Sequence, residues 1–204
     1  MTDGLITLGL TGSIGMGKST TLELFEEAGC AVWDADAAVH RLYAPGAPGA
    51  AAVAEAFGPS VLDAAGGVDR AVLSTVVLND RDALARLEAL VHPLVGADRQ
   101  AFLSRARAEG ARIAVLDVPL LFETGNPDAL DAVVVVTADD ATRRARVLAR
   151  PGMSEALFED LLSRQMPDAE KRARADYVID TSNGIEAARA EVERVLELIL
   201  SLNR

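Results

Sequence analysis

The octapeptide GSIGMGKS, residues 12–19, joins an apolar run to a helix-forming run and decides the fold class. Backbone N–H groups of a glycine-rich turn can point at phosphate oxygens because few side chains obstruct them, and the following helix N-terminus adds a favourable dipole. In the P-loop pattern, the lysine reaches the β- and γ-phosphates of ATP, and the serine hydroxyl ligates the bridging Mg²⁺. The sequence therefore predicts a P-loop that binds ATP and Mg²⁺, and an ordinary glycine-rich turn is the weaker alternative.

Five short aliphatic runs predict strands, and helix-forming stretches separate them. The runs cover residues 5–10, 31–33, 112–116, 132–136 and 177–179. Strands that alternate with helices and carry continuous apolar runs form parallel sheets with helices on both faces. We therefore expect an α/β fold of the P-loop NTPase type, with a five-stranded parallel sheet flanked by helices. Ligands bind at the carboxyl ends of such strands.

Two intervals between the expected strands are far longer than ordinary connecting loops. The first predicts helices over 50–57, 70–77, 81–91 and 93–109, with a break at His92-Pro93. We interpret residues 44–109 as an inserted helical substrate subdomain and the arginine-dense residues 138–176 as a lid. The nucleotide-binding core then comprises 1–43, 110–137 and 177–204 of a single kinase domain. The last helix, 185–202, has an apolar stripe that should pack on the sheet: Val192, Val195, Leu196, Ile199 and Leu202.

Composition limits the possible partners and compartment. A formal net charge of -11 over 204 residues argues against a general binder of nucleic acid or of anionic membranes. Cys30 is the single cysteine, no apolar run nears the length of a membrane span, and the N-terminus lacks a basic segment. These features predict a cytoplasmic protein. Oligomeric state is left open. Positive charge is supplied by 18 arginines and only two lysines, Lys18 and Lys171.

Carboxylates follow two of the expected strands. Asp36 lies just beyond the second strand, where it could take a proton from an acceptor hydroxyl, or could instead cap the helix expected from Ala37. Spacing alone leaves these two roles equal. Asp117 closes the third strand, the usual setting of the acidic residue that holds Mg²⁺ in P-loop proteins, and Asp34 competes for that task.

Arginines and histidines supply the remaining candidates. Arg143, Arg146 and Arg150 are spaced to share one helix face, which could clamp phosphates in a closing lid or could simply be solvated. His40 lies one turn beyond Asp36 and faces substrate or solvent. At the expected helix junction, His92 is as suited to structural hydrogen bonding as to ligand contact.

Together these residues resemble the dephospho-CoA kinases, which are P-loop kinases related in fold to the nucleoside monophosphate kinases. The resemblance runs over nearly the whole chain. It is carried by LTGSIGMGKST (10–20), DAD (34–36), PG (45–46), VDR (68–70), LE (87–88), HP (92–93), DVPLLFE (117–123), Gln165 and ADYVI (175–179). The DAD and DVPLLFE segments discriminate best, because generic P-loop kinases lack both.

The resemblance implies transfer of the ATP γ-phosphate to the ribose 3'-hydroxyl of dephospho-CoA, the last step of coenzyme A synthesis. It implies catalytic roles for Asp36 as the base, for Lys18 and for Arg146. The implied ATP-binding residues are Gly12, Gly15, Met16, Gly17, Lys18, Ser19, Thr20, Arg146 and Arg150. The implied metal ligands are Ser19 and Asp117. The implied acceptor-binding residues are Asp36, His40, His92, Pro119, Leu120 and Leu121.

Two competing functions are weighed against this one. A P-loop kinase acting on another small acceptor, such as a nucleoside monophosphate, would also accommodate a helical insertion. A GTPase-type switch is disfavoured because neither lysine is preceded by asparagine, so the Asn-Lys-x-Asp element that reads guanine is absent from the sequence.

Overall fold

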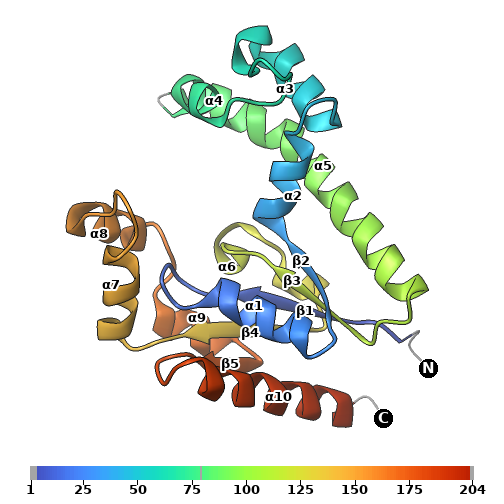
Figure 1. The fold of residues 1–204 in the computed structure, drawn as a ribbon, viewed down its shortest axis with the longest axis vertical. Coiled ribbons are helices and arrows are strands. Elements are labelled where there is room, and N and C mark those ends of the chain that lie inside the picture. Colours follow the sequence, from blue (N-terminus) through green and yellow to red (C-terminus); the bar gives the residue numbers. More distant parts are fainter. Residues whose placement is uncertain (1–3, 79, 203–204) are drawn as a thin grey trace. The chain divides into compact units, whose positions relative to one another are not determined.

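The five expected strands form one parallel sheet in the computed structural model, which describes residues 4–78 and 80–202 (Figure 1). Their order is β2-β3-β1-β4-β5. The strands are β1 (Ile6–Thr11), β2 (Ala31–Asp34), β3 (Ile113–Asp117), β4 (Ala132–Thr137) and β5 (Tyr177–Asp180). This confirms the α/β fold class. Each strand runs one residue past the apolar run that predicted it and ends on a threonine or an aspartate, so polar side chains collect at the carboxyl edge of the sheet.

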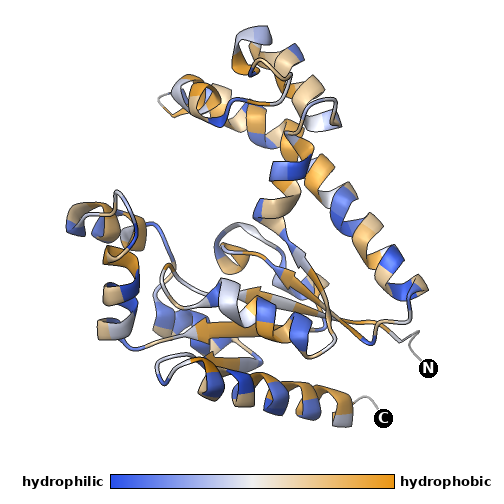
Figure 2. Ribbon diagram, in the orientation of Figure 1, coloured by the Kyte–Doolittle hydropathy of each residue, from blue (hydrophilic) through white to orange (hydrophobic). Residues whose placement is uncertain are grey.

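The chain divides into two compact units, residues 1–32 with 106–204, and residues 33–105. In the first unit, helices cover both faces of the sheet. Alternate residues of β4 show this arrangement, because Val134 packs with α1 (Lys18–Glu27) and α10 (Ile185–Leu202), whereas Val133 and Val135 pack with α6 (Leu121–Thr124). The strands are accordingly apolar along their length (Figure 2).

Helix α10 presents most of its expected stripe to this core. Val192, Val195, Leu196 and Ile199 are all buried. Leu202 was wrongly included, because it is 76% exposed in the last turn of the helix, beyond the edge of the core. The remaining elements of this unit are η2 (Pro127–Ala129), α7 (Asp140–Leu148), α8 (Glu155–Ser163) and α9 (Asp168–Arg174).

The second unit is helical and has its own apolar core. It contains α2 (Ala35–Leu42), α3 (Pro48–Phe57), η1 (Pro59–Val61), α4 (Arg70–Val77) and most of α5 (Arg81–Ala108). Buried residues such as Leu42, Val53, Val61 and Leu73 form one cluster. Within the part of the chain that the structure describes, no helix is both long enough and apolar enough to cross a membrane.

The break expected at His92-Pro93 is wrong, because α5 continues through Pro93 as a single helix. An internal proline removes one backbone hydrogen bond and clashes with the preceding turn, at a cost of about 3 kcal/mol. The apolar face nevertheless continues across it, since Leu87, Val91 and Leu94 all pack on the unit's core. Pro93 itself is exposed. Tertiary packing thus overrides the local signal.

Candidate active site

The phosphate loop links the end of β1 to the start of α1. Gly15 and Gly17 have φ angles of 81° and 88°, in the left-handed region that L side chains rarely adopt. A Cβ on Gly15 would also come within 2.5 Å of Val147 in α7. Gly17 is the N-cap of α1 and offers no side-chain cap, so the first N–H groups of α1 remain available to an anion. This geometry is that of a phosphate cradle.

Lys18 forms an ion pair with Asp117. Its Nζ lies 2.5 Å from both carboxylate oxygens, and the two side chains are 17% and 3% exposed. The pairing follows from the sheet, because β1 and β3 are neighbours and Leu10 lies opposite Asp117 in the register. The lysine predicted to bind phosphate and the aspartate predicted to bind metal therefore lie within reach of each other at one strand edge.

The other residues of the loop divide by exposure. The Ser19 and Thr20 side chains are exposed at the start of α1. Met16 is only 1% exposed, and its Sδ accepts the Ala138 N–H at 3.1 Å. Its side chain is therefore a core group, and any contact it makes with a nucleotide must come from its backbone. Gly12 has no side chain to contribute.

Arg146 of α7 is fixed beside the phosphate loop. Its guanidinium donates to Thr181 Oγ1 and to the Thr181 carbonyl, each at 2.8 Å. Thr181 Oγ1 in turn donates to the Met16 carbonyl at 2.8 Å. A Cβ on Gly17 would lie 3.3 Å from Arg146 Nη1, which places this cation at the loop. Thr181 is not predictable as a site residue, since a threonine after a strand carries no distinctive sequence pattern.

The neighbouring arginines do not share that position. Arg143 pairs with Asp140 at 2.8 Å and lies over the Phe158 ring. The expectation that Arg150 continues the same helical face is wrong, because α7 ends at Leu148. Pro151 follows Arg150 and disfavours helical backbone at the residue before it.

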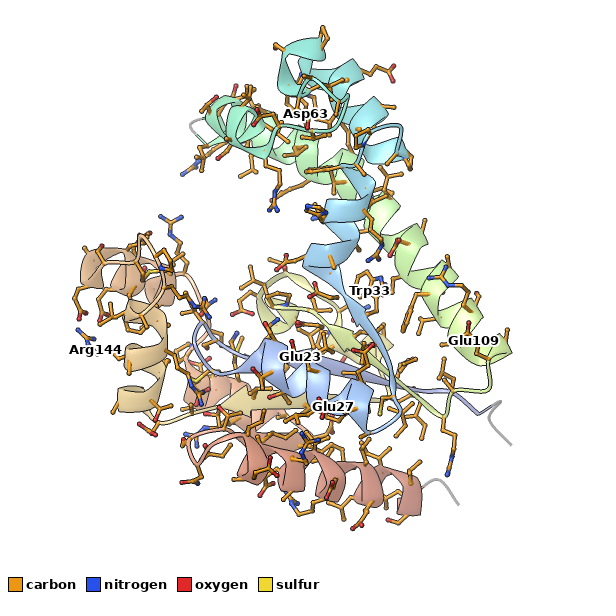
Figure 3. The ribbon with its side chains drawn as sticks, viewed as in Figure 1. Glu23, Glu27, Trp33, Asp63, Glu109 and Arg144 are labelled. Carbon is orange, nitrogen blue, oxygen red and sulfur yellow. The ribbon has the colours of Figure 1, made fainter. Side chains whose placement is uncertain are left out.

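Arg144 joins α7 to α8. It forms ion pairs with Glu155 and Glu159, and its guanidinium lies 5.9 Å from the Phe158 ring centroid. Arg144 is labelled in Figure 3. The arginine segment is therefore largely tied down by contacts within α7 and α8. Among Arg143, Arg144, Arg146 and Arg150, Arg146 is the one that bonds to Thr181, which in turn bonds to the phosphate loop.

Asp36 does not cap a helix. Helix α2 begins at Ala35, and Asp34 is its N-cap, accepting the Ala37 N–H at 2.9 Å. The capping alternative for Asp36 is therefore wrong: the helix starts two residues earlier than expected, and Asp36 lies in its first turn with its side chain exposed. Four residues on, His40 lies on the same side of α2 and is also exposed.

Helix α2 is anchored within its own unit through Asp98 of α5. Trp33 Nε1 and Arg41 Nη2 each donate to Asp98 Oδ1 at 2.7 Å (Trp33 is labelled in Figure 3). Burial raises the pKa of Asp98, but the hydrogen bonds from Trp33 and Arg41 outweigh it and leave the pKa below its ordinary value. These contacts fix both ends of the segment that carries Asp36 and His40. His92 is exposed on α5.

The segment after β3 contributes both core and surface residues. The Pro119 carbonyl accepts the Thr11 hydroxyl at 3.1 Å. Leu121 is 2% exposed and packs in the core, whereas Leu120 is 39% exposed. Pro119, Leu120 and Leu121 are the expected acceptor-binding residues that follow β3, and Leu120 has the most accessible side chain of these three.

The fold and phosphate loop define a P-loop kinase. The family model for dephospho-CoA kinase matches residues 6–187. The chain therefore belongs to the dephospho-CoA kinase family. It is 57% identical over 193 residues to the dephospho-CoA kinase of Mesorhizobium japonicum, covering 95% of this chain and 96% of the relative. It is likewise 57% identical to that of Cereibacter sphaeroides, covering 93% of each chain.

Solved structures agree with this assignment. Dephospho-CoA kinase from Campylobacter jejuni matches with a TM-score of 0.65 and 25% identity, over 96% of this chain and 97% of that one. A shikimate kinase from Acinetobacter baumannii matches with a TM-score of 0.52 at 21% identity, over 97% of this chain and 94% of that one, and so shares the fold. The chain is an ATP-dependent kinase with a hydroxyl acceptor.

Proposed function

We propose that this kinase transfers the γ-phosphate of ATP to the ribose 3'-hydroxyl of dephospho-CoA, giving coenzyme A and ADP. Membership of the dephospho-CoA kinase family supports this acceptor. The single structural observation that carries the phosphoryl-transfer chemistry is the cradle formed by Gly15, Gly17 and Lys18 at the end of β1. Positioning and electrostatic stabilisation account for most catalysis of this kind.

Different residues around the phosphate loop are proposed to bind phosphate, to neutralise its charge and to hold Mg²⁺. Backbone N–H groups of the loop hold the phosphates, and Lys18 and Arg146 neutralise charge on the transferring group. Among the described residues, no cluster of three or more His, Cys, Asp or Glu side chains could hold a metal by itself. Ser19 and Asp117 are the residues that would hold Mg²⁺ together with the ATP phosphates, and the bound ion would neutralise phosphate charge.

Asp36 is proposed as the base that takes the proton of the acceptor hydroxyl. Its exposed carboxylate is free of the capping task that Asp34 performs. Asp36→Asn should lower kcat by about 10²-fold or more, the range of general-base contributions, while ATP binding stays near normal. Asp34→Ala is the matched control, since it removes the side-chain cap of α2 and should lower stability more than turnover. An unchanged kcat in Asp36→Asn would remove Asp36 from the mechanism.

The remaining assignments extend the same proposal. We propose that residues 44–109 recognise dephospho-CoA, with contributions from His40 and His92, and from Pro119, Leu120 and Leu121 after β3. Residues 138–176, with Arg150, act as the lid in this proposal. The enzyme is proposed to act in the cytoplasm.

An acceptor screen tests the proposed function. ADP release should depend on both dephospho-CoA and Mg²⁺, and the product should carry its new phosphate on the ribose 3' position. AMP and shikimate serve as the competing acceptors. If either of them stimulated turnover and dephospho-CoA did not, the proposed acceptor would be wrong while the kinase class would stand.

A further inference from the structure

Lys171 is the second of only two lysines in the chain, and the reaction above does not use it. It lies in α9 with a side chain that is 0% exposed. Burying an ammonium group costs several kcal/mol unless a negative charge compensates it. That charge is Glu123 of α6, whose Oε1 lies 2.8 Å from Lys171 Nζ and whose side chain is 14% exposed.

The pair is poorly hydrogen-bonded for a buried one. Within the described residues, neither Lys171 Nζ nor Glu123 Oε2 has a partner in full hydrogen-bond geometry. Buried ion pairs of this kind are often no more stabilising than apolar residues of similar volume. Net stability is therefore a weak explanation for a lysine at this position in a chain that otherwise uses arginine.

What the pair does determine is the position of Glu123 Oε1. This oxygen also accepts the Met166 N–H at 2.8 Å. Met166 lies in the short connection between α8 and α9, and the preceding residue is Gln165. Burial raises the pKa of Glu123, but Lys171 and the Met166 N–H outweigh it and lower the pKa overall, so the carboxylate stays ionised as an acceptor.

Gln165 reaches the phosphate loop itself. Its Oε1 accepts the N–H of Ile14 at 3.0 Å. Ile14 lies between Gly12 and the left-handed Gly15, in the part of the loop that has no regular secondary structure. A side-chain amide therefore fixes one of the loop's backbone groups, and the backbone beside that amide is held by Glu123 and Lys171.

The first turn of α9 is also anchored. Asp168 in its first turn accepts the Thr137 hydroxyl at 2.9 Å, at the carboxyl end of β4. Asp168 further pairs with Arg172 at 3.1 Å. Because Asp168 holds α9 to the end of β4, the Lys171 side chain is held in a fixed position relative to the sheet.

We propose that Lys171 is a positioning residue for the phosphate loop: paired with Glu123, it holds the 164–167 connection so that Gln165 keeps Ile14 and the loop in the phosphate-binding conformation. The positioning role rests on one part of the proposed function, namely that the phosphate loop binds ATP. It assigns the two lysines to one task, since Lys18 touches the phosphates and Lys171 keeps the loop shaped to receive them.

Two double variants separate positioning from stability. Glu123→Leu with Lys171→Met removes both charges and also the acceptor of the Met166 N–H. Glu123→Gln with Lys171→Met removes the same charges but keeps an amide oxygen as acceptor. The measurements are calorimetric binding of a non-hydrolysable ATP analogue with Mg²⁺, the Tm of each variant, and KM for ATP and for dephospho-CoA.

The Leu-Met variant should bind the analogue about three- to tenfold more weakly than the Gln-Met variant, the range of one hydrogen bond. KM for ATP should rise in parallel, while KM for the acceptor stays unchanged and both variants remain folded. Gln165→Met should weaken binding similarly, and adding it to the Leu-Met variant should cause little further loss, because coupled residues are not additive.

Wild-type analogue affinity in the Leu-Met variant would overturn the proposal, as would full additivity with Gln165→Met. Analogue binding needs no acceptor. A wild-type protein that failed to phosphorylate dephospho-CoA would therefore refute the proposed function and leave this test intact.

Discussion

Lys18 and Lys171 lie in two regions of the first compact unit, and each pairs with a carboxylate. Lys18 and Asp117 meet at the carboxyl edge of the sheet, where Lys18 is 17% exposed. Lys171 and Glu123 meet between α9 and α6, where Lys171 is fully buried. A partly exposed ion pair can exchange its partners with a ligand. The buried Lys171–Glu123 pair, called the sealed pair below, is inaccessible to a ligand and can only hold the neighbouring residues in place.

The largest expected effect breaks the pair at the sheet edge. Lys18→Ala removes the cation proposed to stabilise charge on the transferring phosphate, so kcat should fall by about 10²-fold or more. Steady-state kinetics with dephospho-CoA would measure this. Near wild-type turnover would contradict the assignment of the loop itself.

Breaking the buried Lys171–Glu123 pair should also lower the stability of the fold. Lys171→Met leaves Glu123 largely buried without its cation, which should lower the free energy of unfolding by about 3 kcal/mol. Urea denaturation at neutral pH would measure the loss. The Glu123→Gln, Lys171→Met variant should recover most of it, and no recovery would mean that the charge imbalance is not the cause.

The sealed pair also predicts a pH dependence. The pKa of Glu123 is lowered from 4.5 on folding, so its ionised form contributes stability above that pH, and the contribution is lost as the pH falls through the lower folded pKa. The stability difference between wild type and Glu123→Gln should therefore shrink as the pH falls below about 4.5. Denaturation series at several pH values would test this, and a constant difference would contradict it.

The smallest effect is expected at an exposed pair. Arg189 of α10 and Glu27 of α1 lie 2.6 Å apart, but Glu27 is 57% exposed (Glu27 is labelled in Figure 3). Water and salt screen such pairs, so Glu27→Gln should shift Tm by less than about 2 °C. A shift as large as that of Lys171→Met would show that burial does not rank the ion pairs of this protein.

Much of the fold was predictable because the sheet is built from continuous apolar runs. The sequence also located the glycines, Lys18 and Ser19 of the loop, since their spacing is set by phosphate geometry. The strand ends were missed by one residue because polar residues there, such as Asp117 and Thr137, look like loop in a hydrophobicity pattern. The strand ends that the hydrophobicity pattern missed carry the polar side chains at the carboxyl edge of the sheet, beside the phosphate loop.

Other features depend on contacts between distant residues. Pro93 predicts a helix break, and only the packing of Val91 and Leu94 shows that α5 continues. The bridge from Arg146 through Thr181 to the loop joins residues 35 positions apart and leaves no periodic signal. Lys171 stood out by its rarity, but its partner could not be inferred from spacing.

The Lys18–Asp117 pair also changes how ATP entry should be described. Before a nucleotide binds, the Lys18 ammonium already has the Asp117 carboxylate as its counterion. In the proposed function, Lys18 passes to phosphate while Asp117 passes to Mg²⁺. Nucleotide capture is then an ion exchange, in which Lys18 and Asp117 give up their mutual contact and each takes a new partner of opposite charge.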